Sequence, residues 1–581
     1  MHIYKTKKLV FVMTLLNLHL QPFAQPLIEW QRCIGSSGNE FFGLEATLHQ
    51  AYDGGTFLFT SSQANDGDIT CYLGDLDVSI VKINQNGLIE WQECYGGSNW
   101  EQAHTNSSPS LDEGFIFTAQ TQSNDGDVGC SFETGRAWLV KTNNFGIIDW
   151  ENCWEGKRIS KIMTTDNGGF VLFGTANYDN NGITDCWVAI TDSNGIVQQE
   201  GTFGGSQEEI TGGYGIKGNI ETSNDGGYFL CSSTSSDDGD VSGFHGGGVE
   251  GISYYGDVWV VKLNTNLNIE WQRCLGGSSD EILKGAKKTQ DGGLIVAAEV
   301  LSNDGDVSGN HGGMDAWLAK IDESGNLLWQ RCLGGSADEE IVGFEILPEG
   351  GAILLARTTS NDGDVDFNHG SLDFWLVKID EMGEVLWDKC LGGSEGDEAW
   401  DLKLTSDNSY LITGVTFSND GSVSGNNGQA DGWLAKISSD GNLLWQKCYG
   451  GSSLDGFESL ILSSSGNLMA KGLTDSNDID VTGNNGQGDH WVVKFQDDAS
   501  NTLSYNENNA VIFPNPCTEM TMLSISIEDI GKSYCITNSL GRIIMQGQLN
   551  SKQTPVMLSH LAPGLYSLSI ENGPTQKLIK Q

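Results

Sequence analysis

The chain has 581 residues, of which 77 are Gly, 17 are Trp and only 9 are Pro. Its 77 acidic residues outnumber its 31 basic residues, and the resulting net charge of −46 repels nucleic-acid phosphates and anionic membranes, so we exclude both as partners. Apolar residues occur along the whole length, which excludes a disordered chain, and short β-rich runs between Gly, Asn and Asp predict an all-β protein.

The first 24 residues have the layout of a secretory signal peptide. Lysines lie before an apolar run over residues 9–20, and Ala24 is the small residue that precedes the expected cleavage. This order predicts export and removal of residues 1–24. No later run approaches the roughly 18 apolar residues of a membrane-spanning helix, so we expect no transmembrane segment in the mature chain.

Residues 25–496 repeat a unit of about 58 residues. Its first marker is a Trp-containing strand, in most copies followed by Gly-Gly-Ser. Eight copies occur: WQRC at Trp30, Trp271 and Trp329, WQEC at Trp91, WENC at Trp150, WDKC at Trp387, WQKC at Trp445 and the degenerate QQEGTFGGS at 198–206. A repeat of this length is too long for one coil of a β-solenoid, so we favour units that stack side by side.

Each unit carries three further markers. They are DGG before an apolar run (291–298), an acidic loop (302–317) and a strand such as DAWLAKID (315–322). A short turn that ends at Gly325 then leads into the next Trp strand, as in a hairpin of three to five residues. These markers therefore predict four antiparallel strands in each unit.

Both faces of these strands are apolar, so each sheet needs a neighbour on both sides. This predicts an all-β fold: a β-propeller of about eight four-stranded repeats. A propeller of seven blades is the alternative, because the third unit (150–197) is short and the fourth (198–270) is long. Pairing of residues 27–33 with 489–495 would close the ring and remove the sheet edges.

The motifs GNLLW, LGGS, DGG and DAWLAKID together resemble the SBBP family of bacterial β-propeller repeats, over roughly residues 27–496. The resemblance implies the fold and says nothing specific about function, since propellers host many activities. That family is usually drawn with seven blades, whereas this chain contains eight units.

The repeat ends before a polar linker at 497–508, and residues 509–581 form a different domain. FPNP (513–516), LGR (540–542) and PGLY (563–566) resemble the C-terminal sorting domain of the type IX secretion system of Bacteroidota. The resemblance implies export, with the secretion machinery as partner, and a protein that is secreted or attached to the outer cell surface. The residues alone predict a small β-sandwich of six or seven short strands.

The acidic loops have the spacing of a calcium-binding loop. Carboxylate or hydroxyl oxygens occur at positions 1, 3, 5 and 12, a spacing that aims them at one centre. The candidate ligands are Asp304, Asp306, Ser308 and Asp315 in one loop and Asp478, Asp480, Thr482 and Asp489 in another. Ca²⁺ is the one cofactor that we hypothesise. The alternative is a plain turn, because Asn, Asp and Gly favour turns by themselves.

Several His and Cys residues also recur at fixed places in the repeat. His245, His311 and His369 precede Gly in successive loops, and we interpret them as turn residues. Most of the 13 Cys occupy the Trp strand, where we expect small buried side chains. Cys71 with Cys130, and Cys517 with Cys535, are candidate disulfides.

No catalytic motif stands out. The irregular insertion 246–257 holds Tyr254 and Tyr255, which would stack on a sugar or dock a protein unless they are simple surface residues. Our hypothesis is a secreted or surface propeller that binds a glycan or a surface protein. The alternatives are a polysaccharide-active lyase or hydrolase on a propeller, and a purely structural surface role.

Overall fold

The computed structural model describes most of the chain, which divides into two compact units, residues 1–496 and 497–581. In the first unit it describes residues 25–496 except 37–45, 52, 63–65, 71–72, 111, 131–135, 166, 178–182, 214, 247–255, 464–465 and 487. In the second it describes residues 511–580 except 514–519, 525–531, 538–541, 550–552, 559–560, 562–563 and 571–574. Within these residues no helix is long and apolar enough to cross a membrane.

The described part of the first unit forms eight antiparallel sheets of four or five strands, which we number as blades 1 to 8, and one two-stranded sheet. Blades 1 to 4 contain β2 (Thr47–Gln50), β3 (Thr56–Ser62), β4 (Asp77–Ile83) and β5 (Ile89–Tyr95); β6 (Glu101–Pro109), β7 (Phe115–Thr121), β8 (Arg136–Thr142) and β9 (Ile148–Glu155); β10 (Lys157–Thr164), β11 (Phe170–Ala176), β12 (Asp185–Thr191) and β13 (Val197–Phe203); and β14 (Glu209–Ile210), β17 (Asn219–Thr222), β18 (Tyr228–Thr234), β19 (Asp257–Leu263) and β20 (Ile269–Leu275).

Blades 5 to 8 are the most regular. They contain β21 (Glu281–Lys288), β22 (Leu294–Val300), β23 (Asp315–Ile321) and β24 (Leu327–Leu333); β25 (Glu339–Ile346), β26 (Ala352–Thr358), β27 (Asp373–Ile379) and β28 (Val385–Leu391); β29 (Asp397–Leu404), β30 (Tyr410–Thr416), β31 (Asp431–Ile437) and β32 (Leu443–Tyr449); and β33 (Asp455–Leu462), β34 (Leu468–Thr474), β35 (Asp489–Phe495) and β1 (Ile28–Ile34).

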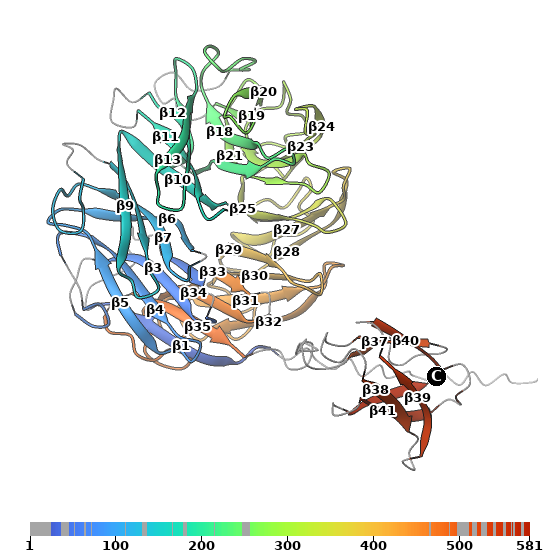
Figure 1. Cartoon of the computed structure of the whole chain (residues 1–581). Helices are drawn as coiled ribbons and strands as arrows, with labels where there is room; N and C mark the ends of the chain where they lie inside the picture. Colours follow the sequence, from blue (N-terminus) through green and yellow to red (C-terminus); the bar gives the residue numbers. More distant parts are fainter. Residues whose placement is uncertain are drawn as a thin grey trace, which may run out of the picture. The chain divides into compact units, whose positions relative to one another are not determined.

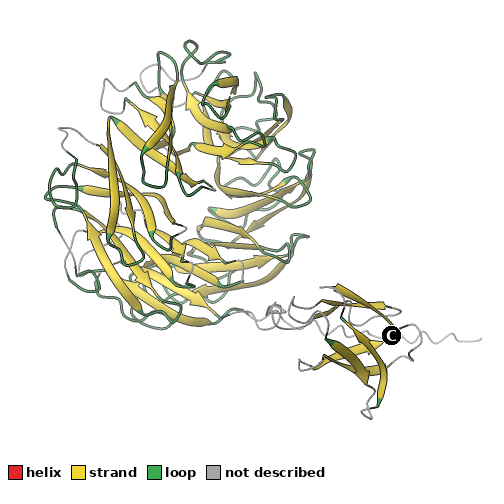
Figure 2. Ribbon diagram, in the orientation of Figure 1, coloured by secondary structure: helices red, strands yellow, loops and turns green. Residues whose placement is uncertain are grey.

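The blades are arranged in a ring, and the first strand of each blade lies nearest its axis, the region that we call the channel (Figures 1 and 2). The first strands contact one another in order, and β2 of blade 1 contacts β33 of blade 8. The predicted β-propeller is therefore confirmed, with eight blades. The Trp strand of each repeat is the outermost strand, and the acidic loop joins the second strand to the third.

Blade 8 closes the ring with strands from both ends of the repeat region. β1 pairs antiparallel with β35, so that Cys33 lies opposite Trp491 and Trp30 opposite Lys494. The predicted pairing of 27–33 with 489–495 is confirmed. Closure follows from the phase of the repeat, because the first Trp strand lacks a blade of its own.

The short third unit and the long fourth unit both form blades. Blade 4 departs in its inner edge, where β14 and β17 both pair with β18. A two-stranded hairpin of β15 (Gly212–Gly213) and β16 (Ile216–Lys217) stands between them. The inner strand of blade 4 is thus interrupted by an excursion, which positions Lys217 as described below.

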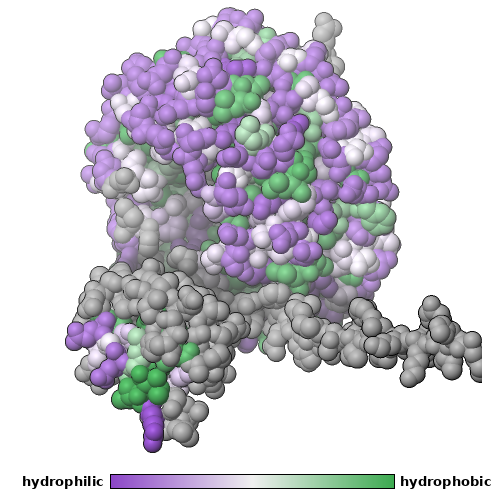
Figure 3. Space-filling view, turned by 90° about the vertical axis from the view of Figure 1, so that its right-hand side faces the viewer, coloured by the Kyte–Doolittle hydropathy of each residue, from purple (hydrophilic) through white to green (hydrophobic). Residues whose placement is uncertain are grey.

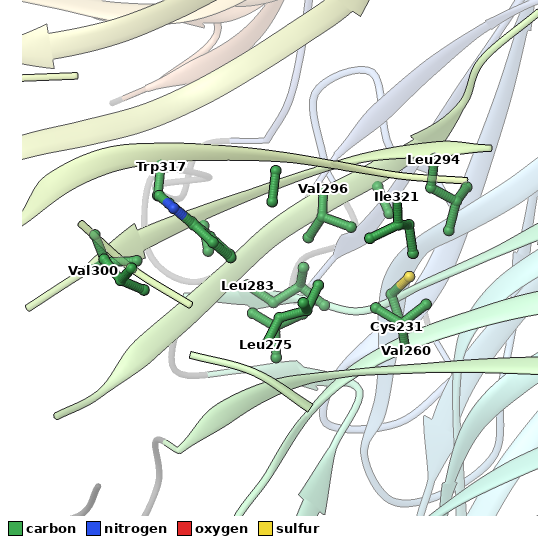
Figure 4. Close-up of a cluster of buried hydrophobic side chains, with 14 of the residues drawn as sticks. Cys231, Val260, Leu275, Leu283, Leu294, Val296, Val300, Trp317 and Ile321 are labelled. Carbon is green, nitrogen blue, oxygen red and sulfur yellow. The ribbon is translucent and has the colours of Figure 1, made fainter. Parts of the chain in front are cut away.

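The hydrophobic cores lie between blades rather than within them. One cluster joins Val260 and Leu275 of blade 4 to Leu283, Val296 and Trp317 of blade 5 (Figure 4). Both faces of each sheet are covered in this way, as the apolar strands predict. On the side seen in Figure 3 the outer surface is mainly hydrophilic, with hydrophobic residues in small groups.

A fully buried Trp marks the third strand of every blade except blade 1. Each donates its indole N–H to the outer strand, to the residue that follows the Trp position, for example Trp317 to Gln330 Oε1 at 2.8 Å; in blade 3, where Gln199 replaces that Trp, the acceptor is Glu200. The others are Trp138, Trp187, Trp259, Trp375, Trp433 and Trp491, all at most 1% exposed. Burial of so large a side chain requires a partner for its only polar atom.

One disulfide contradicts the sequence prediction. Cys130 pairs with Cys153, with their Cα atoms 6.2 Å apart, so the predicted Cys71–Cys130 bridge is wrong. Cys153 comes from the Trp strand, where we expected an unpaired thiol. A thiol of the acidic loop and one of the outer strand of the same blade meet because the loop folds back over that strand. Cys535 is a free thiol, so the predicted Cys517–Cys535 bridge does not form either.

The second unit contains two antiparallel sheets in its described part. One has the strands β36 (Val511–Phe513), β37 (Met520–Ser524) and β40 (Gln553–Met557). The other has β39 (Ile543–Gln548), β38 (Ser533–Thr537), β41 (Gly564–Ile570) and β42 (Thr575–Lys580). A buried core that includes Ile536, Val556 and Leu568 draws on both sheets, as expected for a small sandwich.

Replacement of a third-strand Trp tests the interblade core. Trp317→Ala should lower the free energy of unfolding by about 3–5 kcal/mol, because it leaves a large cavity in the core between blades 4 and 5. Trp329→Ala is the control, since Trp329 lies half-buried on the outer strand. Urea denaturation followed by Trp fluorescence measures both, and equal losses would contradict the assignment of the core.

Candidate functional site

The first predicted calcium loop has its acidic side chains directed to the preceding blade. Asp304 Oδ1 accepts the backbone N–H of Ser278 at 2.7 Å, and Asp306 Oδ1 lies 2.9 Å from Arg273 Nη2. Ser278 belongs to the Gly-Gly-Ser segment between blades 4 and 5. Asp304 and Asp306 therefore clasp the loop of blade 5 to blade 4.

The other two predicted ligands of this loop bind within blade 5. Ser308 Oγ accepts a hydrogen bond from Gln330 Nε2 at 2.6 Å. Asp315, which is fully buried, accepts the backbone N–H of His311 at 3.0 Å through Oδ2. The structure thus gives Asp304, Asp306, Ser308 and Asp315 separate partners and does not bring the four together.

The second predicted loop repeats this arrangement. Its contacts are Asp478 Oδ1 with Ser452 N at 2.8 Å, Asp480 N with Gly450 O at 3.3 Å, Thr482 Oγ1 with Gln31 Nε2 at 2.6 Å and Asp489 Oδ2 with Asn485 N at 2.9 Å. Calcium binding by these loops stays a prediction. Tyr254 and Tyr255 lie outside the described residues.

Two buried carboxylates face each other at the junctions between blades. Asp257 starts the third strand of blade 4, Glu281 starts the inner strand of blade 5, and neither is exposed. A Cβ added to Gly276 would lie 2.2 Å from Glu281 Oε2 and 2.9 Å from Asp257 Oδ1, so both oxygens face the same small space. Burial raises the pKa of Asp257 to about 6 and that of Glu281 to about 8, and the charge of Asp257 adds to the rise in the pKa of Glu281.

The loop histidines bridge such junctions. His245 Nδ1 lies 2.7 Å from Asp257 Oδ2, and its Nε2 lies 3.9 Å from Asp306 of the next blade. His311 makes the same contacts with Asp315 at 2.7 Å and Asp364 at 3.7 Å. These residues do more than form turns, because each imidazole stands between carboxylates of two blades.

The inner strands share a β-bulge that aims one side chain at the channel. In β29, for example, Ala399 pairs with Gly414 and Asp401 with Thr413, so Trp400 is the extra residue. A bulge bends its strand and redirects a side chain. The extra residues at this place differ between blades: Ser160, Lys284, Val342, Trp400 and Glu458.

Lysines gather in a channel cavity of about 370 Å³ that the inner strands of blades 3 to 7 line. Its basic residues are Lys161, Lys217, Lys284, Lys287 and Lys403, and its acidic residues are Glu221, Glu345 and Asp401. Five cations among the chain's 31 basic residues therefore meet in one cavity of a strongly acidic protein. Four of these lysines are ion-paired, Lys161 with Glu221 at 3.2 Å and Lys284 with Glu299 at 3.0 Å among them, so the excess positive charge lies at the fifth.

Lys217 is the lysine of this cavity that lacks an acidic partner. Lys287 pairs with Glu345 at 2.7 Å and Lys403 with Asp401 at 2.8 Å. Lys217 Nζ donates only to a carbonyl, that of Val342 at 3.2 Å, and no carboxylate of the described residues lies within ion-pair distance of it. Desolvation by the surrounding blades, followed by repulsion from Lys284, lowers the pKa of Lys217.

A second cavity, of about 320 Å³, is mainly apolar and is lined by residues of blades 7 and 8 and of their loops. Trp400 and Phe417 line it, and each side chain is 42% exposed. The guanidinium of Arg357 lies 4.6 Å from the centre of the Trp400 ring. Glu398 and Glu458 also line it, so a flat aromatic surface stands among hydrogen-bond acceptors.

The sequence motifs predict neither cavity. The lysine cavity is lined by inner strands, whereas the apolar cavity also involves the second strands of blades 7 and 8 and loop residues such as Phe417. The inner-strand residues that line them differ between repeats, so the shared motifs give no signal for them. The available signal was the run after Gly-Gly-Ser, where the repeats place Lys284, Val342, Trp400 and Glu458 at equivalent positions. A position that varies within an otherwise regular repeat is typical of a binding surface.

The C-terminal unit matches a protein family whose role is known. Residues 511–581 match the family described as the secretion system C-terminal sorting domain. The protein is thus an exported eight-bladed β-propeller, carried by the type IX secretion system through its C-terminal domain. It is secreted or attached to the cell surface.

Other similarities are remote. The β-agarase A of Zobellia galactanivorans is 26% identical over 99 residues, which are 16% of this chain and 18% of that relative's length. The quinohemoprotein alcohol dehydrogenase of Comamonas testosteroni has a TM-score of 0.41 at 10% identity, with 81% of this chain and 76% of that chain covered.

Two further solved structures are remotely similar to this chain. The β-propeller domain of the Trilobed protease of Pyrococcus furiosus has a TM-score of 0.34 at 9% identity, with coverage of 69% and 95%. PorZ, a surface component of the type IX secretion system of Porphyromonas gingivalis, has a TM-score of 0.22 at 10% identity, with coverage of 95% and 100%. Such similarities assign no activity.

A glycine substitution tests the junction between blades 5 and 6. Gly334→Ala should lower the free energy of unfolding by about 1–3 kcal/mol, because the new Cβ would lie 2.1 Å from Glu339 Oε2 and 3.0 Å from Asp315 Oδ1. Gly343→Ala is the control, since an added Cβ there meets nothing within 4 Å. Thermal unfolding measures both, and a stable Gly334→Ala variant would argue against a tight carboxylate pair.

Proposed function

We propose that the exported propeller is a binding module for an acidic polysaccharide, which it takes up in the central channel. The observation that carries this proposal is Lys217, a cation without an acidic partner next to a second cation, Lys284, in a cavity. A carboxylate or sulfate group of a ligand would supply the missing counter-ion. Charge-assisted hydrogen bonds of this kind are about twice as strong as neutral ones.

The aromatic cavity supports a sugar as the carrier of that charge. An exposed indole offers a flat apolar surface on which a sugar ring can stack, and neighbouring carboxylates accept hydrogen bonds from hydroxyls. Trp400 provides the surface, with Glu398 and Glu458 beside it. Because Trp400 and Asp401 are consecutive and line the two cavities, one extended saccharide can reach both.

The charge distribution supports a local site rather than general attraction. At a net charge of −46 the molecule as a whole repels a polyanion, but this repulsion is screened within about 8 Å at physiological ionic strength. Ammonium groups inside the cavity act at contact distance and are screened much less. We therefore expect selective binding in the channel and no adhesion of polyanions to the outer surface.

Binding is favoured over catalysis by the engagement of the acidic groups. In the lysine cavity Glu345 and Asp401 each form an ion pair, at 2.7 and 2.8 Å. A glycosidase instead needs two carboxyl groups that flank the scissile bond. Turnover of a bound polysaccharide by the purified propeller would favour the enzyme.

Lys217→Gln tests the anionic subsite. The variant should bind an acidic polysaccharide such as polygalacturonate at least about tenfold more weakly, because it removes a charged donor. Lys389→Gln, on the outer strand β28, changes the net charge equally and should bind like the wild type. Isothermal titration calorimetry provides the affinities. Equal affinity of all three proteins, or no binding by the wild type, would refute the proposal.

Trp400→Ala tests the saccharide subsite. Because Trp400 is 42% exposed, the variant should fold normally but lose affinity for acidic and neutral oligosaccharides alike. Quenching or a shift of Trp fluorescence on titration with ligand reports on stacking in the wild type. If the variant keeps full affinity for a ligand that Lys217→Gln weakens, the ligand is an anion that does not use the aromatic cavity.

A further inference from the structure

A trio of metal-binding side chains converges in blade 6, outside the channel. His369 Nδ1 lies 3.0 Å from Asp373 Oδ2, and Cys390 Sγ lies 3.5 Å from the same oxygen. All three donor atoms lie within 4.8 Å of one another. With bonds of about 2.0 Å to nitrogen and oxygen and about 2.3 Å to sulfur, tetrahedral zinc places such donors about 3.3–3.5 Å apart.

Asp373 is a fully buried carboxylate whose two oxygens face different neighbours. Oδ2 meets His369 and Cys390, whereas a Cβ added to Gly392 would lie 2.2 Å from Oδ1 and 2.7 Å from Asp397 Oδ2. Oδ1 has no hydrogen-bond partner among the described residues, but the same holds for the equivalent Asp315 of blade 5. The feature particular to blade 6 is therefore the convergence of three donor atoms at Oδ2.

Blade 5 contains the same three residue types and provides an internal comparison. There His311 and Asp315 form the same contact, but His311 Nε2 also reaches Asp364 of the next blade at 3.7 Å. Cys332 is buried in the core between blades 4 and 5. The trio of blade 5 is thus used for packing and for the bridge between blades.

Blade 6 lacks the partners that complete this arrangement. His311 of blade 5 faces Asp364 of the next blade, but the residue equivalent to Asp364 near His369 is Ser422. Among the described residues no carboxylate therefore lies within ion-pair distance of His369 Nε2. Cys390 is only half-buried, and although it packs against the core between blades 5 and 6, its sulfur lies 3.5 Å from Asp373 Oδ2.

The surroundings of the trio are also more acidic than in blade 5. Asp366 and Asp388 replace the hydrogen-bonded pair Ser308 and Gln330. Two carboxylates therefore stand in blade 6 where blade 5 has a neutral hydrogen-bonded pair.

We propose that His369, Asp373 and Cys390 bind a divalent transition-metal ion of the zinc type. The imidazole, the carboxylate and the thiolate provide three ligands, and the partial exposure of His369 and Cys390 leaves room for water or a ligand group as the fourth. Binding displaces the thiol proton of Cys390 to solvent and leaves the imidazole proton on Nε2. The ion ties the loop before β27 to the outer strand β28.

Metal titration of the full chain tests this proposal. The protein is prepared metal-free under a thiol-free reductant, and Zn²⁺ is titrated in competition with a chromophoric chelator. We expect one equivalent to bind with high affinity and the midpoint of thermal unfolding to rise, because the ion binds the folded state only. Co²⁺ should give the sulfur-to-cobalt charge-transfer band of a thiolate ligand.

Matched variants assign the site. Cys390→Ala should no longer bind one equivalent of zinc and should lack the cobalt charge-transfer band. Cys332→Ala, its counterpart in blade 5, should keep both properties. His369→Asn should also lose high-affinity binding and still fold, since blades 7 and 8 have Asn427 and Asn485 at this place. Lys217→Gln should bind zinc like the wild type, which separates this site from the channel.

Three results would overturn the proposal. They are absence of zinc binding by the wild type, unchanged binding by Cys390→Ala, and equal loss in Cys332→Ala. Near-ultraviolet circular dichroism of each variant shows whether it is folded. If Cys390→Ala is not folded, zinc binding by His369→Asn tests the proposal instead.

Discussion

The hydrogen bond between a buried Trp and the outer strand determines how each blade is built. The third-strand indole can be fully buried only because its N–H meets an acceptor that follows the Trp position in the outer strand. This bond sets the register of the two strands and leaves the large ring to fill the space between blades. Where the acceptor is Gln330, the amide also donates to Ser308, so one side chain connects third strand, outer strand and loop. In blade 8 the same bond, from Trp491 to Gln31 at 2.6 Å, joins the two ends of the repeat region.

The architecture could be predicted from the sequence because it depends on features that every repeat shares. Apolar strands on both faces, hairpin turns with Gly325 and its counterparts, and the phase of the first Trp strand are all local, and together they specify a closed propeller. What could not be predicted involves contacts between units. The pairing of Cys130 with Cys153 requires the path of a loop over its own blade, and the role of Asp304 requires the position of Ser278 in the previous blade.

The acidic loops show that spacing along the chain does not by itself give the contacts of each side chain. Asp304, Asp306, Ser308 and Asp315 have the spacing of a loop that closes on one ion, but their side chains bind partners in two different blades. Asp304 binds a backbone N–H of the preceding blade, a use of carboxylate that turn-forming residues often have. Much of the acidity of the loops therefore serves to join blades. The contacts of such a loop differ from blade to blade where the residue that its side chains meet is replaced.

Differences between repeats are for this reason the most informative feature of the molecule. The framework holds each inner-strand bulge at an equivalent place around the channel, so a single substitution in one unit presents a new side chain without disturbing the fold. Lys284 and Trp400 occupy such places, and the excursion in blade 4 adds Lys217 from a different element. The acidic loops vary in the same way on the outer part of the ring, where Asp388 and Ser422 remove contacts that blade 5 retains. A regular repeat thus allows binding chemistry to arise separately at the channel and at the rim, because the interblade core and the Trp hydrogen bonds keep the blades in place at both.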